Sequence, residues 1–168
     1  ADGNIEKETS NLLLQSNSFN TSSWGSVSNI RTGGQVGYDG TNNAWLTESI
    51  IDGNNSFFSQ GRNNSGLYTI SIYAKAGSSD WMALFTTGSQ NAYFNLASGV
   101  LGSKTSNVIN SSIESVGNGW HRCSATLASN NNFYVFLANG DGDNITNSGD
   151  NIYIQDAQLN QGLIAQEV

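Results

Sequence analysis

The chain contains no proline, one cysteine and one histidine, and only 11% of its 168 residues are charged. The single cysteine, Cys123, excludes an internal disulfide framework. It lies in a segment of alternating polarity, so we expect a small buried apolar side chain. The single histidine, His121, lies in the same segment and is expected to be structural. It leaves no second histidine for a catalytic metal site, and no GxSxG nucleophile motif is present.

Basic residues are also scarce, because six Lys and Arg stand against 13 Asp and Glu, for a net charge of −7. Binding to nucleic acid requires Lys and Arg that displace counterions, so this balance argues against a nucleic-acid partner. It argues equally against an anionic membrane surface. No apolar run approaches the roughly 18 residues of a membrane-spanning helix. We therefore expect neither nucleic-acid binding nor membrane insertion.

The first ten residues, ADGNIEKETS, lack the basic-then-apolar pattern of a secretory signal peptide. Two explanations stay open. Either a signal has been removed, or the protein leaves its cell by another route, such as in a virus particle. Both place the protein outside a cell, in an extracellular setting or on a virion surface.

The residues that are abundant indicate a folded chain with many turns. Hydrophobic residues make up 37% and aromatic residues 10% of the chain, which is enough to bury a core. Asn and Ser together exceed a quarter of the residues, and there are 19 glycines. Asn and Gly tolerate positive φ angles, so they favour tight turns between short segments. At this length, one domain is the simplest organisation.

Short runs of alternating polarity predict about nine strands, and helical periodicity is nearly absent. The fold class expected is therefore all-β, an antiparallel β-sandwich of the jelly-roll type with little or no helix. The clearest pattern places Tyr68, Ile70, Ile72 and Ala74 on one face of a strand. The expected strands are Ala44–Ser49, Ser56–Gln60, Leu67–Lys75, Trp81–Thr86, Ala92–Leu96, Asn107–Ser115, Gly119–Leu127, Asn132–Leu137 and Asn151–Leu159.

The two ends of this pattern are expected to lie side by side. Residues 11–24 (NLLLQSNSFNTSSW) are interpreted as a first strand followed by a turn, and residues 151–159 (NIYIQDAQL) as the last strand. A sandwich closes when its first and last strands become neighbours. The predicted boundaries are a leader or linker at 1–10, the sandwich domain at 11–164 and a C-terminal connector at 165–168.

Four segments, in order, resemble a known family. NLLLQSNSFNTSSW, YTISIYAKAG, VGNGWHRCSATL and NIYIQDAQL are similar to the opening, central, Trp-bearing and final strands of jelly-roll carbohydrate-binding modules of families four, nine and twenty-two. With GQVGYDGTNNAW added, the string also resembles a domain that recurs in tail fibres, head fibres and other virion proteins of marine bacteriophages. The resemblance implies partners of two kinds, polysaccharides or cell-surface glycans and other virion proteins. A homo-oligomer is also expected.

The resemblance to the carbohydrate-binding modules further implies a structural calcium ion between the first and last strands. Asp156 matches the acidic position of the last strand, and Ser18 or Asn20 falls near the opening ligands. Calcium takes six to eight oxygen ligands, and neutral oxygens can serve, although fewer carboxylates weaken the affinity. A second candidate is NGDGDN, in which Asp141 and Asp143 resemble part of a calcium loop. An acidic hairpin turn explains that segment equally, since DG and NG pairs favour hairpins.

Loop-borne aromatic residues are the candidates for ligand contact, because sugar rings stack their C–H faces on Trp and Tyr. Trp45 and Trp120 fall within alternating strands and are expected in the core. Most aromatic residues of a sandwich are buried. The expected ligand-binding residues are Trp24, Tyr38, Trp81 and Tyr93. Trp24 lies in a Ser-rich turn, Trp81 follows a polar turn and Tyr38 lies in a loop, while Tyr93 and Tyr134 are supporting members of the same pool.

Catalysis is not expected. The acids Glu48, Asp39, Asp52, Asp80 and Glu114 are scattered, and spacing alone neither supports nor rejects a glycosidase pair. Three hypotheses remain. The first is a non-catalytic virion-surface module of a marine phage that binds glycans or mediates adhesion. The second is the carbohydrate-binding module of a secreted polysaccharide-degrading enzyme. The third is a purely structural capsid or fibre building block without a sugar site.

Overall fold

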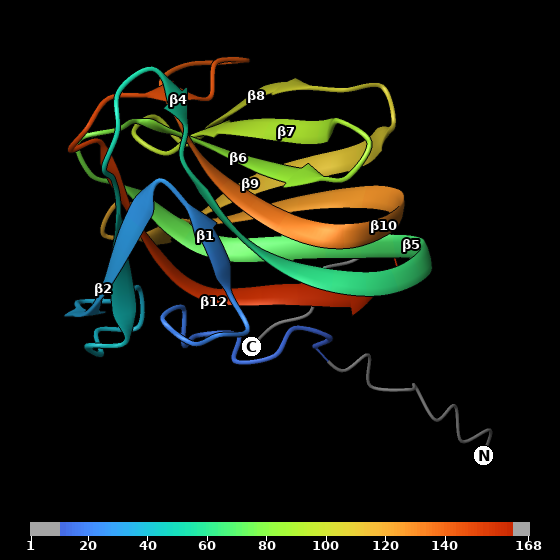
Figure 1. Cartoon of the computed structure of the whole chain (residues 1–168), viewed down its shortest axis with the longest axis horizontal. Coiled ribbons are helices and arrows are strands. Elements are labelled where there is room, and N and C mark those ends of the chain that lie inside the picture. The colour runs from blue at the N-terminus through green and yellow to red at the C-terminus, as the bar shows by residue number, and fades with distance from the viewer. Residues whose placement is uncertain (1–10, 163–168) are drawn as a thin grey trace.

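The computed structural model describes residues 11–162. The predicted leader 1–10, the connector 165–168 and the last two residues of the 11–164 domain lie outside the described residues. Within residues 11–162 the chain is all-β, and the predicted antiparallel β-sandwich is confirmed (Figure 1). No helix in this range is long and apolar enough to cross a membrane.

Two long strands, β5 (Phe57–Ala76) and β10 (Trp120–Ala138), bend and take part in both layers of the sandwich (Figure 1). They pair with each other from Phe57 opposite Phe136 to Lys75 opposite Trp120, with register shifts between Ala128 and Asn132. Strands that bend in this way carry one sheet into the next at a corner. The four segments predicted within 56–75 and 119–137 are thus halves of two continuous strands.

Each layer is completed by shorter strands. The first contains β1 (Gly25–Val27), β6 (Trp81–Thr86), β7 (Gln90–Asn95) and β8 (Val100–Lys104) beside one half of β5 and β10. The second contains β2 (Asn29–Gln35), β3 (Ala44–Ser49), β12 (Asn151–Gln161) and β9 (Val108–Gly117) beside the other half. A separate pair of short strands, β4 (Asn54–Asn55) and β11 (Ile145–Thr146), lies at one end.

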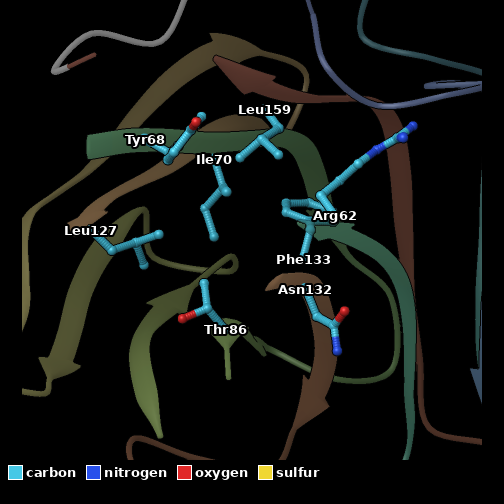
Figure 2. A pocket seen from close by; sticks show the side chains of 8 residues that line it. All are labelled: Arg62, Tyr68, Ile70, Thr86, Leu127, Asn132, Phe133 and Leu159. Carbon is cyan, nitrogen blue, oxygen red and sulfur yellow. The ribbon is translucent and has the colours of Figure 1, made fainter. Parts of the chain in front are cut away.

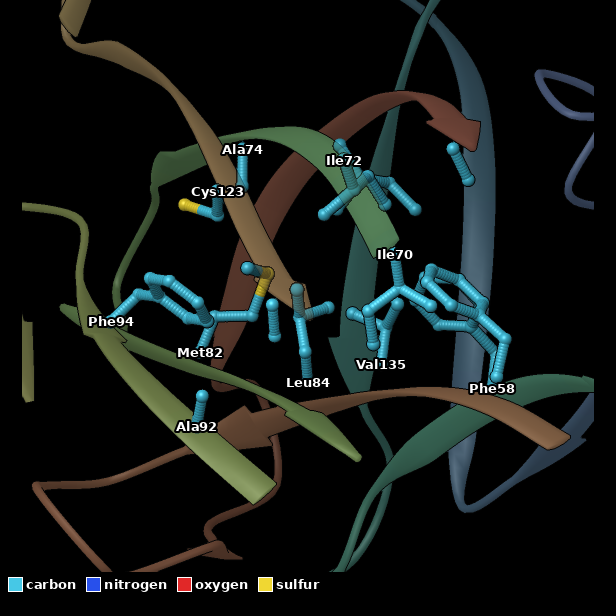
Figure 3. Packing of buried hydrophobic residues seen from close by; sticks show 14 of the residues in the cluster. Phe58, Ile70, Ile72, Ala74, Met82, Leu84, Ala92, Phe94, Cys123 and Val135 are labelled. Atoms are coloured by element: carbon cyan, nitrogen blue, oxygen red, sulfur yellow. The ribbon is translucent and has the colours of Figure 1, made fainter. Parts of the chain in front are cut away.

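The main core lies between the two layers (Figure 3). Alternation places Ile70 and Ile72 of β5 inward from one layer, and Met82 and Leu84 of β6 inward from the other. All four are at most 1% exposed, and each such side chain contributes about 1.5–3 kcal/mol relative to an exposed position. Cys123 is also fully buried, as predicted, and burial raises the pKa of its thiol.

The prediction that residues 11–24 begin with a strand is wrong, although their position is right. The segment runs as a series of turns beside β12. Leu12 N donates to Leu159 O at 2.9 Å, and Ala157 N donates to Ser16 O at 2.9 Å. The Asn11 side chain also bonds the backbone of Ala157 and Leu159. Asn and Ser side chains compete for backbone groups in this way and favour turns over strands.

Candidate functional site: an aromatic outer face

The first layer is apolar on both sides of two neighbouring strands. An antiparallel sheet with one solvated face usually alternates apolar residues inward and polar residues outward. In β6, however, Met82 and Leu84 enter the core while Trp81 and Phe85 lie on the opposite side. In the second half of β10 the same holds, with Phe133, Val135 and Leu137 inward and Tyr134, Phe136 and Ala138 outward.

These outward rings form one continuous patch, called here the aromatic face. The register places Phe57, Phe136, Ala83 and Tyr93 directly opposite one another across β5, β10, β6 and β7. Phe136 lies 4.7 Å from Phe57 and 4.4 Å from Phe85, measured between ring centroids. The members of the aromatic face are Phe57, Trp81, Phe85, Tyr93, Tyr134 and Phe136.

The aromatic face is only partly covered. Tyr93 and Phe136 are buried, whereas Phe57, Trp81, Phe85 and Tyr134 are half-buried. An open hollow of about 290 Å³ lies at one end of β6, lined by Phe85, Thr86, Thr87, Ser89, Tyr134 and Phe136. An apolar patch of this kind on an outer surface is typical of a binding site.

A second hollow lies between the layers and is too small for a ligand. Its lining includes Arg62, Asn132 and Phe133 at the bend of β5 and β10, together with Ile70 and Leu127 (Figure 2). Its volume is about 10 Å³, which is roughly the space of one water molecule. Of these two hollows, the one on the aromatic face is therefore the candidate binding site.

Two predicted metal residues lie beside the far end of the aromatic face. Asp141 Oδ1 accepts bonds of 2.7 Å from both the backbone N and the Oγ of Ser103 in β8. Asp143 forms a bridge with Gly140, and its Oδ1 accepts a bond from Ile145 N. These contacts are those of the acidic hairpin turn. Burial raises the pKa of Tyr93, and the carboxylates of Asp143 and Asp141 add to the rise.

Because Gly102 of β8 has no side chain, Asp141, Trp81 and Tyr93 can pack closely around it, and these residues form a corner of the aromatic face. A Cβ added there would lie 2.6 Å from Asp141 Oδ1, 2.7 Å from the Trp81 ring and 2.9 Å from Tyr93 Cβ. Such separations are shorter than van der Waals contact. Gly102 therefore brings the predicted ligand residues Trp81 and Tyr93 and the predicted metal residue Asp141 to one place.

The other two predicted ligand residues lie elsewhere. Trp24 is 3% exposed and packs against Phe19 and Phe58 in the core, while its indole N–H donates to Gln15 O. The expectation that Trp24 is an exposed ligand-binding residue is therefore wrong, because the turns of residues 11–24 fold it inward. Trp120 is buried as predicted, and Trp45 packs against the core.

Tyr38 is loop-borne but lies on the outer side of the second layer, so it does not join Trp81 and Tyr93. Its ring stacks on Tyr73 at 3.8 Å, and its hydroxyl donates to Asp156 Oδ2 at 3.0 Å. Trp120 and Tyr153 pack in the same cluster, which we call the tyrosine face: Tyr38, Tyr73, Trp120 and Tyr153. Burial and the Asp156 carboxylate raise the pKa of the Tyr38 hydroxyl.

Asp156 lies at a bulge of β12, where the register with β5 shifts and its own φ is +48°. Its neighbours are Tyr38, Gln155 and Asn17, because Gln155 Nε2 contacts its carboxylate and its backbone N donates to Asn17 Oδ1. Gln155 Nε2 also reaches Asp39 Oδ2 at 3.3 Å. Burial raises the pKa of Asp156, the Asp39 carboxylate adds to the rise, and the bonds from Tyr38 and Gln155 oppose it.

The remaining predicted metal residues are part of the turns beside this bulge. Ser18 O accepts bonds from the backbone N and Oγ1 of Thr21, and the Asn20 side chain is exposed. The side chain of residues 11–24 that contacts Asp156 is instead that of Asn17. Among residues 11–162, no three His, Cys, Asp or Glu side chains are grouped closely enough to hold a metal ion.

Sequence reasoning did not find Phe57, Phe85 and Phe136 of the aromatic face. The signal was available in WMALFT and FYVFLA, whose unbroken apolar runs contrast with the clean alternation of the other strands. Such a run predicts a strand covered on both faces. On the outer side of β6 and of the second half of β10, the other strands and connections cover these rings only in part.

A scan against protein-family models finds no match, and a search of curated proteins finds none either. Among solved structures, the chain is similar to TmCBM61 in complex with β-1,4-galactotriose, with 13% identity and a TM-score of 0.51 over 92% of this chain and all of that one.

It is also similar to the enzymatically active domain of tailspike protein 4 from bacteriophage CBA120, with 10% identity and a TM-score of 0.52 over 89% of this chain and 21% of that one. The CBM22-1 xylan-binding domain of Paenibacillus barcinonensis Xyn10C is 12% identical, with a TM-score of 0.47 over 86% of this chain and 89% of that one. At such identities, the similarity to TmCBM61 and to the CBA120 tailspike establishes the fold alone, which is a jelly-roll β-sandwich like that of a carbohydrate-binding module.

Proposed function

We propose that this chain is a non-catalytic polysaccharide-binding domain and that the aromatic face is its binding surface. The observation that carries the proposal is the row of half-buried rings on the outside of β5, β10 and β6, beside an open hollow of about 290 Å³. Aromatic rings offer flat apolar surfaces to the C–H faces of sugars, and few polar groups are needed to orient the chain. TmCBM61, which shares the fold, holds β-1,4-galactotriose.

The test replaces rings on and off the aromatic face. Trp81→Ala and Phe85→Ala should each weaken polysaccharide binding about tenfold or more, because aromatic anchors dominate such interfaces. Tyr153→Ala is the matched control, since Tyr153 is also half-buried but lies on the other layer. Binding is measured by a glycan array and then by calorimetry, beginning with β-1,4-galactan and β-1,4-xylan oligomers. An array without a hit, or full affinity in both face variants, would refute the proposal.

For the biological setting, we propose the surface of a phage virion, where many copies of a weakly binding domain act together. The likeness of fold to the CBA120 tailspike supports this setting, and the alternative is an accessory domain of a secreted polysaccharide-degrading enzyme. Light scattering and native mass spectrometry distinguish them. A stable homo-oligomer favours the virion part, whereas a monomer encoded beside glycoside hydrolase genes favours the enzyme. A tight oligomer with no array hit favours a purely structural block.

We also propose that the Asp156 bulge is the place for a structural calcium ion. The available donors are oxygens, which calcium prefers, and Gln155 Nε2 lies within hydrogen-bond distance of a carboxylate oxygen of both Asp39 and Asp156. Asp39 and Asp156 would hold the ion, which would stabilise the contact between residues 11–24 and β12. We do not place the ion at Asp141 and Asp143, because the contacts of their Oδ1 atoms are those of a hairpin turn.

Thermal melting with calcium and with chelator tests this site. Calcium should raise the melting temperature of the wild-type protein and of Asp141→Asn, but not of Asp156→Asn. Equal melting temperatures of the wild-type protein with and without calcium would exclude the site.

A further inference from the structure

Within residues 11–162, no Lys or Arg side chain lies over a ring of the aromatic face, and this bears on the charge of its ligand. Lys75 lies over the Tyr153 ring and Arg122 over the Tyr73 ring, both on the tyrosine face. Arg31 lies over Phe58 within the core, and Arg62 bonds Gln60 at the bend of β5. Lys104 Nζ is turned to the backbone carbonyl of Val108 at the β8–β9 connection.

The aromatic face instead has carboxylates at its Trp81 end. Asp141 is fixed by the two bonds from Ser103 to Oδ1, and within residues 11–162 no hydrogen bond engages its second oxygen, Oδ2. Asp143 lies in the same exposed hairpin, and both carboxylates are near the Tyr93 ring. Gly102 keeps Asp141 against Trp81, so the charge lies beside a ring that a bound sugar would contact.

We infer that the aromatic face binds chains of uncharged or amine-bearing sugars and discriminates against uronate-containing and sulfated polysaccharides, with Asp141 as the residue that sets this preference. The inference rests on the proposed function, since it names the ligand class of the same surface. An anionic sugar beside Trp81 would meet two carboxylates and no cation from residues 11–162. An amine would meet an open carboxylate oxygen.

The expected discrimination is modest because both carboxylates are exposed. Two unit charges about 4 Å apart in a water-like medium interact by roughly 1 kcal/mol, which corresponds to about fivefold in affinity. Salt screens such an interaction, with a Debye length of about 3 Å at 1 M ionic strength. We therefore expect affinity to fall about fivefold from amine-bearing to neutral and again from neutral to anionic forms. This order should vanish at about 1 M salt.

The experiment compares derivatives of one backbone that differ only in charge. β-1,4-Galactan and β-1,4-glucan oligomers are each used in neutral, amine-bearing and sulfated form, and calorimetry gives the affinity of each at low and high salt. Asp141→Asn preserves the oxygen that Ser103 contacts and removes the charge. Glu114→Gln is the control, because it removes one charge from an exposed position of β9 in the other layer.

The inference predicts that Asp141→Asn narrows the gap in affinity between neutral and sulfated oligomers about fivefold, while Glu114→Gln leaves this gap unchanged. Sulfated oligomers that bind the wild-type protein as tightly as neutral ones would overturn the inference and leave the proposed function standing. A gap that Asp141→Asn and Glu114→Gln change equally would overturn the role of Asp141. Loss of binding to every oligomer would instead refute the proposed function itself.

Discussion

The outer sides of the two layers both carry clusters of aromatic residues, but different groups cover the two clusters. On the tyrosine face, the connection between β2 and β3 brings Tyr38 onto Tyr73, and Trp120 is 1% exposed. Arg122 and Lys75 supply further cover, because their charged groups lie over the Tyr73 and Tyr153 rings. On the aromatic face, four of six rings stay half-buried. Tyr38 and Tyr153 of the tyrosine face are half-buried too, so the difference lies in the cations: two lie over the tyrosine face, and within residues 11–162 none lies over a ring of the aromatic face.

Each face also has a pair of carboxylates beside a tyrosine. The two pairs differ in their hydrogen-bond partners and in their exposure to solvent. Asp156 is bonded by Tyr38 and Gln155, and Gln155 links it to Asp39. Asp141 and Asp143 are held only by their hairpin and by Ser103, and both are exposed. The first pair is therefore tied to the connection between β2 and β3, whereas the second pair is exposed to solvent.

The largest expected effect is a difference in stability between variants of the tyrosine face and variants of the aromatic face. Trp120→Ala should lower the free energy of unfolding by about 3–5 kcal/mol, because it removes a fully buried ring. Trp81→Ala should cost clearly less, since Trp81 is half-buried and its loss leaves a smaller cavity. Urea denaturation of both variants measures the difference. Equal losses would mean that the aromatic face is as much a part of the folded core as the tyrosine face.

An intermediate effect is expected from filling the corner of the aromatic face. Gly102→Ala should destabilise the protein by about 1–3 kcal/mol, because the added methyl group overlaps Trp81, Tyr93 and Asp141. Gly25→Ala in β1 is the control, since its nearest neighbour would be 3.7 Å away. Denaturation and calorimetry are measured together. If Gly102→Ala has no more effect than the control, the corner is looser than the geometry indicates.

The smallest expected effect concerns pH and the Asp156 pair. The folded-state pKa of Asp156 lies above its ordinary value of 3.8, so the folded protein binds this proton more readily than the unfolded chain. Its unfavourable contribution is present at neutral pH and is relieved as the pH falls through the folded pKa towards 3.8.

In chelator, Asp156→Asn should therefore be more stable than the wild-type protein at pH 7, by less than about 1 kcal/mol after solvent screening. The difference should disappear near pH 3.5, as measured by urea denaturation across this range. Asp141→Asn is the comparison on the other face. A wild-type protein that is the more stable of the two at pH 7 in chelator would contradict this account of the pair.

The sequence predicts much of the fold where apolar and polar residues alternate strongly. The bounds predicted for Ala44–Ser49 and Trp81–Thr86 coincide with β3 and β6. The bends of β5 and β10 were not predictable, because residues 61–66 and 128–132 carry the Asn and Gly signals of turns. These two stretches face each other across the sheet, with Asn64 opposite Asn130 and Gly61 opposite Asn132. Pairing between strands overrides the local preference for a turn.

By itself, the sequence determined the inward sides of the strands, because a period of two assigns each side chain to one side of a sheet. It also determined that outward aromatic residues exist. Only the tertiary structure decided which of them are covered. Tyr38 reaches Asp156 across 118 residues of sequence, while Asp141 reaches Ser103 across 38. Burial on an outer face depends on where distant connections lie, and no local pattern encodes that position.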